Sequence, residues 1–175
     1  MKLTAAIFGG IILMTSMTMA QEDESSVLSV IPTPQKLISK NSRFKFGAGT
    51  RIVLGSDSRE EQFAAQQLND ALAAKKETQV KVVAENSMRR LPASFIFIGA
   101  PTTEFGRSLM RDRKAVLTSQ MKSEGYFLDA DPSGIVLLAE SEAGRFYGVM
   151  TLLQLLRTEK SASLKAKPEL RLRIW

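Results

Sequence analysis

The chain of 175 residues contains no cysteine and no histidine. Without cysteine it has no disulfide bonds, no thiolate nucleophile and no cysteine ligands for zinc, and without histidine it lacks the commonest general base and metal ligand. Serine stands in no recognisable nucleophile motif. The sequence therefore predicts no catalytic, metal-binding or cofactor-binding residue in this chain. It also gives no support to an enzymatic activity carried by the chain itself.

A long apolar run is also missing. The stretch from Ala5 to Met14 is apolar but too short to cross a bilayer, and it stands between Lys2 and the small residues of Thr18 to Ala20. This arrangement is typical of a signal peptide cleaved before Gln21, so we expect residues 1–20 to be removed and the protein to be exported to the periplasm or the exterior. The alternative is a buried N-terminal helix. We expect no membrane span.

Charge of one sign is not concentrated in any segment. The formal net charge is +6, but lysine and arginine are scattered among acidic residues and aromatic residues are few. A solvated basic surface explains this pattern better than a nucleic-acid partner. Glu60 and Glu61 are adjacent carboxylates, yet neighbouring helix positions point about 100° apart, so we interpret them as residues of a helix start rather than as a catalytic pair.

The first half of the chain predicts a leader, an edge segment and a helix. Residues 21–26 are polar and acidic, and we expect them to be disordered. Pro32 and Pro34 then favour an extended edge segment. Ser58 and Glu61 form a capping box, which predicts a helix over residues 59–76 with a single apolar stripe.

Residues 94–99 contain an unbroken apolar run, Phe-Ile-Phe-Ile. Because a strand with one solvated face would alternate apolar and polar residues, this run predicts a central strand that is covered on both faces.

The stretch from Glu124 to Leu156 predicts a hairpin followed by a helix. Asp131, Pro132, Ser133 and Gly134 separate two apolar runs in an order suited to a type I turn. Ser141 is then placed to cap a helix. The apolar residues of that helix recur at helical spacing: Phe146, Val149, Met150, Leu152, Leu153 and Leu156.

This second helix has a wide apolar face. Its apolar positions sweep about 160°, more than a helix that covers only a sheet requires. Gly144 and Gly148 leave bare backbone at which another element can approach. We therefore predict a docking face for a further domain at Gly144, Tyr147, Gly148, Thr151 and Leu155. The alternative is that loops or strands of the same domain cover the part of this apolar face that the sheet leaves uncovered.

Three motifs in fixed order resemble the N-terminal domain of glycoside hydrolase family 20, the β-N-acetylhexosaminidases. They are Ile31-Pro-Thr-Pro-Gln35, Glu124-Gly-Tyr-Phe-Leu128, and Glu142-Ala-Gly-Arg-Phe-Tyr-Gly148 with the apolar helix that follows. The resemblance extends over about residues 27–175. Family 84 β-N-acetylglucosaminidases and, more loosely, family 67 α-glucuronidases share this domain and remain second choices.

The resemblance implies a two-layer α+β domain at residues 27–160, with a mostly antiparallel sheet and two main helices on one face. Residues 161–175 would be a linker and a final strand leading to a (β/α)8 catalytic barrel that this chain does not contain. In family 20 an adjacent aspartate and glutamate of the barrel act with the substrate's acetamido group. The one such pair here, Asp23-Glu24, lies in the leader, and we assign it no catalytic role.

Two functions remain open from the sequence. The first is an accessory domain of an exported β-N-acetylhexosaminidase-like enzyme, which supports the barrel in cis, meets amino-sugar glycans only through the parent enzyme and is inactive alone. The alternative is a free-standing module that binds amino sugars or cell-wall glycans, with Trp175, Tyr126 and Tyr147 as candidate stacking residues.

Overall fold

The computed structural model describes residues 30–31, 33–36, 38, 43–76, 80–158, 163–165 and 170–172. The expected signal peptide and leader, and Trp175, lie outside the described residues. In chain order the elements are β1 (Arg43–Lys45), β2 (Arg51–Leu54), α1 (Arg59–Lys76), β3 (Lys81–Ala84), the 3-10 turn η1 (Glu85–Ser87), β4 (Phe95–Gly99), α2 (Glu104–Asp112), the 3-10 turn η2 (Ser119–Met121), β5 (Tyr126–Ala130), β6 (Gly134–Leu138), α3 (Glu142–Thr158), β7 (Ser163–Lys165) and β8 (Leu170–Leu172).

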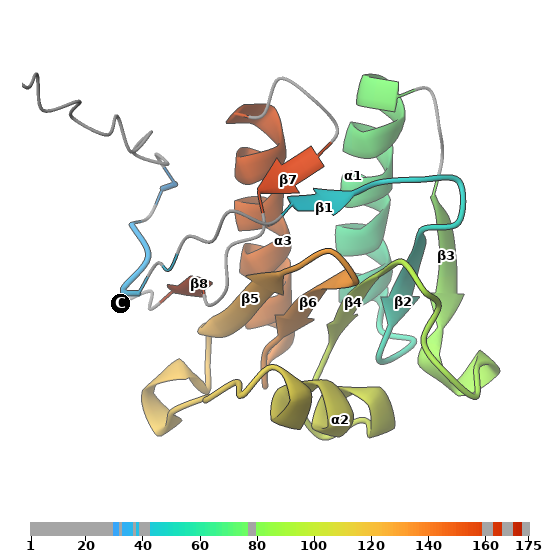
Figure 1. Cartoon of the computed structure of the whole chain (residues 1–175). Helices are drawn as coiled ribbons and strands as arrows, with labels where there is room; N and C mark the ends of the chain where they lie inside the picture. The colour runs from blue at the N-terminus through green and yellow to red at the C-terminus, as the bar shows by residue number, and fades with distance from the viewer. Residues whose placement is uncertain are drawn as a thin grey trace, which may run out of the picture.

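The main sheet has the strand order β3-β2-β4-β6-β5-β8 (Figure 1). Strand β2 is parallel to both β3 and β4, and β4 is parallel to β6. Strand β5 is antiparallel to its neighbours β6 and β8. Strands β1 and β7 form a separate antiparallel pair. The main sheet is therefore mixed.

The α+β class and the two main helices on one face are confirmed, but the expectation of a mostly antiparallel sheet is only partly matched. Helix α1 connects β2 to β3, and a helical crossover returns the chain to the same end of the sheet, which makes the two strands parallel. In contrast, the tight turn between β5 and β6 reverses the chain directly and gives an antiparallel hairpin.

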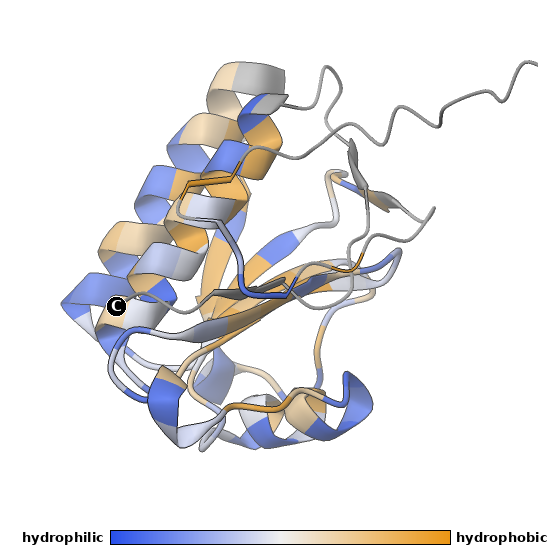
Figure 2. Cartoon of the chain, turned by 90° about the vertical axis from the view of Figure 1, so that its left-hand side faces the viewer, coloured by the Kyte–Doolittle hydropathy of each residue, from blue (hydrophilic) through white to orange (hydrophobic). Residues whose placement is uncertain are grey.

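Both faces of the sheet are covered. Helices α1 and α3 lie on one face and the shorter α2 lies on the other (Figures 1 and 2). Along β4, Ile96 and Ile98 belong to the core under α1 and α3, whereas Phe95 and Phe97 pack with Phe105 of α2. The hydrophobic colour in Figure 2 accordingly gathers along the strands. The prediction of a central strand buried on both faces is confirmed.

The predicted helix caps at Ser58 and Ser141 and the predicted hairpin turn are confirmed. The Ser58 hydroxyl accepts a hydrogen bond from the Glu61 amide at 3.2 Å, and the Ser141 hydroxyl accepts one from the Gly144 amide at 3.0 Å. In the hairpin turn, the Asp131 carboxylate accepts from the amide of Ser133 at 2.8 Å. These three side chains satisfy amides that would otherwise have no partner in a helix start or turn.

The N-terminal segment is held against α3. The amide of Ile31 donates to Gln154 Oε1 and Gln154 Nε2 donates to the carbonyl of Ile31, both at 2.9 Å. Val30 beside it is buried in the core. One side chain of α3 thus pairs with the backbone of the segment as a neighbouring strand would. Within the described ranges, no helix is long and apolar enough to cross a lipid bilayer.

Candidate functional site

The two glycines of α3 lie against the domain's own sheet. A Cβ atom on Gly144 would stand 2.6 Å from the carbonyl oxygen of Gly125 and 2.9 Å from the Cβ of Ala139, and a Cβ on Gly148 would overlap the side chain of Leu137. Atoms in a packed interior do not approach this closely. The bare backbone predicted from the sequence is therefore filled by β6 and by the segment before β5, and it is not open to a further domain.

Thr151 and Leu155 also face inward. Both are buried, and Leu155 belongs to the core between α3 and the sheet. The Thr151 hydroxyl shares a hydrogen bond with the hydroxyl of Tyr126, which is itself fully buried. Burial raises the pKa of Tyr126 well above its usual value, and Tyr126 has no free ring face for stacking on a sugar. For four of the five predicted docking residues, the alternative of cover by the same domain is the one observed.

Tyr147 is different, because 36 % of its surface is exposed. It lies beside Phe146, with ring centroids 5.9 Å apart, and Phe146 stacks on Phe63 of α1 at 6.3 Å. Phe63 is 55 % exposed. We call Phe63, Phe146 and Tyr147 the aromatic patch. Exposed apolar clusters of this kind mark interaction surfaces more often than isolated exposed residues do.

The aromatic patch borders a shallow hollow with acidic rims. Glu60 of α1 and Glu142 of α3 line the hollow together with the three rings, and its volume is about 340 Å³. Glu60 and Glu142 are exposed. The patch therefore combines apolar area with negative charge at the starts of α1 and α3. Carboxylates at these positions also interact favourably with the positive ends of the helix dipoles.

A buried ion pair joins the starts of the same two helices. Arg145 Nε lies 2.5 Å from Glu61 Oε1, and the two side chains are 7 % and 1 % exposed. Glu61 Oε2 accepts a hydrogen bond from the Ser56 amide at 2.9 Å. Arg145 also donates to the carbonyl oxygens of Ala139 and Glu140. The pair thus fixes α1, α3 and the turn after β6 relative to one another beneath the aromatic patch.

Burial raises the pKa of the Glu61 carboxyl above its ordinary value of 4.5, while the charge of Arg145 and the hydrogen bonds from Ser56 act in the opposite direction. The exposed carboxylate of Glu142 raises it further. Desolvation is the largest of these effects, so the ionised form of Glu61 depends on Arg145 for its stabilisation.

The acidic residues considered in the sequence analysis do not form a common site among the described residues. The described part of the chain contains no group of three or more histidine, cysteine, aspartate or glutamate side chains placed to hold a metal ion. Glu60 and Glu61 occupy separate environments, one on the surface and one in the buried ion pair. Asp23-Glu24 lies outside the described residues.

Sequence reasoning missed both the ion pair and the aromatic patch. Glu61 was expected to reach back to its own cap, and its carboxylate instead accepts from Ser56 and pairs with Arg145. A signal existed for Arg145, since an arginine among the apolar positions of α3 needs a buried partner. For Phe63 the signal was weaker, because a single aromatic residue outside the apolar stripe of α1 is common on surfaces.

The chain is similar in sequence to one described family and to a curated enzyme. The family model "Glycosyl hydrolase family 20, domain 2" matches residues 27–168. A β-hexosaminidase of Porphyromonas gingivalis (strain ATCC BAA-308 / W83) is 29 % identical over 138 residues, which cover 78 % of this chain and 15 % of that protein. The chain therefore spans only a small part of this relative.

Solved structures share the fold. The structure of CpGH84D superposes with a TM-score of 0.64 at 14 % identity, over 84 % of this chain and 24 % of that one. The GH20 β-N-acetylhexosaminidase of Streptomyces coelicolor A3(2) superposes with a TM-score of 0.56 at 20 % identity, over 82 % and 26 %. At these identities the likeness concerns the fold, which recurs as one part of larger proteins.

Proposed function

The chain belongs to the glycosyl hydrolase family 20, domain 2 family, and from this we propose that it serves an exported β-N-acetylhexosaminidase by supporting a catalytic (β/α)8 barrel in cis. It is the accessory domain of such enzymes, and amino-sugar glycans are reached only through the parent protein. The observation that carries the proposal is the match over residues 27–168 together with the small share of the β-hexosaminidase that the chain covers. The lysine-led apolar start of the sequence supports export.

The aromatic patch is the surface that suits contact with the barrel. Of the five residues first proposed for docking, Tyr147 is the exposed one, and Phe63 and Phe146 extend its apolar area across α1 and α3. The buried Glu61–Arg145 pair holds both helix starts in register beneath the patch. We infer that the barrel packs on these rings and that Gly144, Gly148, Thr151 and Leu155 support the contact from inside.

A comparison of a longer product with the present chain tests the parent activity. We expect the coding region to continue beyond Trp175 into a barrel with an adjacent aspartate and glutamate. The longer product should release nitrophenol from 4-nitrophenyl N-acetyl-β-D-glucosaminide, whereas the 175-residue chain should release none. Hydrolysis by the chain alone would overturn the accessory role, and a stop codon at this point in an intact locus would overturn the cis barrel.

The docking role of the aromatic patch predicts an effect that appears only in the longer product. Replacing Phe63 and Tyr147 with serine removes apolar area from an exposed surface, so the melting temperature of the 175-residue chain should change little. In the longer product the same change should lower the melting temperature by several degrees, because buried interface area is lost.

Val116 provides the control, since it is 50 % exposed and lies after α2, on the other side of the sheet. Val116→Ser should leave the melting temperatures of the 175-residue chain and of the longer product unchanged. Equal effects of the Phe63 and Tyr147 changes in the short and the long protein would contradict docking at the patch.

A further inference from the structure

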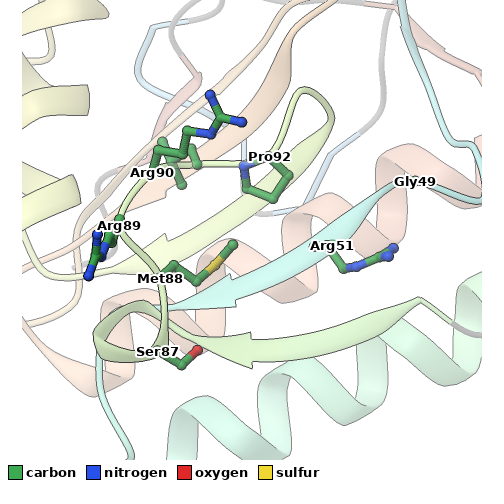
Figure 3. Close-up of a pocket in the computed structure, with 8 residues that line it drawn as sticks. Gly49, Arg51, Ser87, Met88, Arg89, Arg90 and Pro92 are labelled. Carbon is green, nitrogen blue, oxygen red and sulfur yellow. The ribbon is translucent and has the colours of Figure 1, made fainter.

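A second hollow lies on the opposite side of the sheet, between the start of β2 and the loop that follows η1 (Figure 3). It measures about 400 Å³, and its walls include Arg51, Arg89 and Arg90 together with the apolar surface of Met88, Leu91 and Pro92. We call it the arginine hollow. Its volume falls within the range of small-molecule sites.

Positive charge in the arginine hollow has no acidic counterpart among the residues that line it. Within the described ranges the side chains of Arg89 and Arg90, both exposed, make no ion pair or hydrogen bond. Lys81 stands opposite Arg51 in the parallel register of β3 and β2, which adds a fourth cation to the same face. Arg113 and Arg145, in contrast, are each neutralised by carboxylates of this domain. The hollow is therefore an uncompensated basic surface.

Arg51 is held in place by the backbone. Its Nη1 atom donates to the carbonyl oxygens of Ala48 at 3.1 Å and Thr50 at 2.9 Å. Among the described residues, the hydrogen bonds of the Arg51 side chain all run through Nη1, so its other guanidinium nitrogens are available to a ligand. A guanidinium group held in this way loses less conformational entropy when it binds a carboxylate or sulfate.

The three guanidinium groups do not converge on one point. Figure 3 shows Arg51, Arg89 and Arg90 pointing in different directions around Met88 and Pro92. A single small anion would contact one of them, whereas a chain with anionic groups at intervals would contact several. The apolar surface between them suits the C–H face of a sugar ring, and no aromatic residue lines the hollow to stack a nucleobase.

We propose that the arginine hollow binds an anionic oligosaccharide that carries sulfate or carboxylate groups along its length. Arg51 anchors one anionic group at the start of β2, and Arg89 and Arg90, which lie together on the far side of Met88, contact further groups along the same chain. This site is separate from the aromatic patch and does not depend on the activity of a parent enzyme.

Titration of the isotope-labelled 175-residue chain with a chondroitin sulfate hexasaccharide tests the proposal. We expect amide shifts at residues 49–51 and 87–91, and affinity that falls as salt is raised, since the contacts are ionic. The neutral chitohexaose and inorganic sulfate should produce no saturable shifts there. Absence of shifts with the sulfated sugar at low ionic strength would overturn the proposal, and so would equal or tighter binding of a single-stranded oligonucleotide of the same charge.

Two variants that remove the same charge from different places distinguish binding at the arginine hollow from unspecific attraction of the anionic sugar to a basic protein. Arg89→Gln/Arg90→Gln should weaken hexasaccharide binding at least about tenfold, because two charge-assisted contacts are lost. Arg111→Gln/Arg157→Gln removes the same charge from exposed positions on α2 and α3 and should weaken it less than about twofold. Equal losses in the two variants would show unspecific attraction and overturn the site. All four arginines are exposed, so both variants should keep the melting temperature of the parent chain.

Discussion

Replacing Arg145 with methionine is expected to destabilise the domain by about 3–5 kcal/mol, because it leaves the carboxylate of Glu61 buried without a cation. Glu61 is 1 % exposed and cannot turn to water, and Arg145 also binds the carbonyl oxygens of Ala139 and Glu140. Urea unfolding followed by circular dichroism measures the loss.

The loss should depend on pH with a defined sign. Burial raises the pKa of Glu61 above 4.5 in the folded protein, so the folded state binds the extra proton and stability falls as pH rises from 4.5 through the folded pKa. Without Arg145 that folded pKa rises further. Arg145→Met should therefore be closest to the parent chain near pH 4, where Glu61 is protonated, and least stable near neutral pH. A loss that does not change with pH would contradict this account.

The double variant Glu61→Gln/Arg145→Met is the control. It removes both charges, and the glutamine side chain still offers an acceptor to the Ser56 amide. Its free energy of unfolding should lie above the value expected from the two single variants, by a coupling of about 0.5–3 kcal/mol. Additive losses would mean that the two groups do not stabilise each other.

Gly144→Ala is expected to destabilise the domain by about 2–3 kcal/mol. The new Cβ would stand 2.6 Å from the backbone oxygen of Gly125, which cannot move aside as a flexible side chain can. Helix propensity alone predicts the opposite sign, since alanine is favoured over glycine within a helix by about 1 kcal/mol. The sign of the measured change thus distinguishes a glycine packed on its own sheet from one left open for another domain.

Gly47→Ala is the matched control, because a Cβ at Gly47 has nothing within 4 Å and the residue has no positive φ angle. Its free energy of unfolding should stay within about 0.5 kcal/mol of the parent chain. Gly148→Ala should lower the free energy of unfolding less than Gly144→Ala does, because the new Cβ atom meets the tip of the flexible Leu137 side chain. Stabilisation by Gly144→Ala would contradict the packing described here.

Sequence reasoning predicted the features that depend on neighbouring residues. Ser58 and Ser141 cap their helices, and Asp131 closes the hairpin turn, because each acts on amides two or three positions away. The apolar run of β4 likewise predicted a strand covered on both faces. In each case the physical cause lies within the segment itself.

The remaining features depend on contacts between distant segments. Strand direction in the main sheet follows from which strands become neighbours, and the run in β4 did not by itself identify them. Gly144 and Gly148 signalled close approach correctly, but the sequence did not say whether a barrel or the domain's own sheet approached. Glu61 and Arg145 form one site only after α1 and α3 pack side by side.

The hydrogen bonds between Ile31 and Gln154 have a consequence for the order of folding. They close a chain separation of 123 residues, and β1 pairs with β7 across a similar separation. The central strand β4 also lacks one neighbour until β6 exists. A contact between distant residues forms only after the chain between them has lost the entropy of loop closure, so such contacts form late in folding. The helices and the β5–β6 hairpin can form during synthesis, whereas the domain is complete only after its last strands have been made and have returned to its first residues.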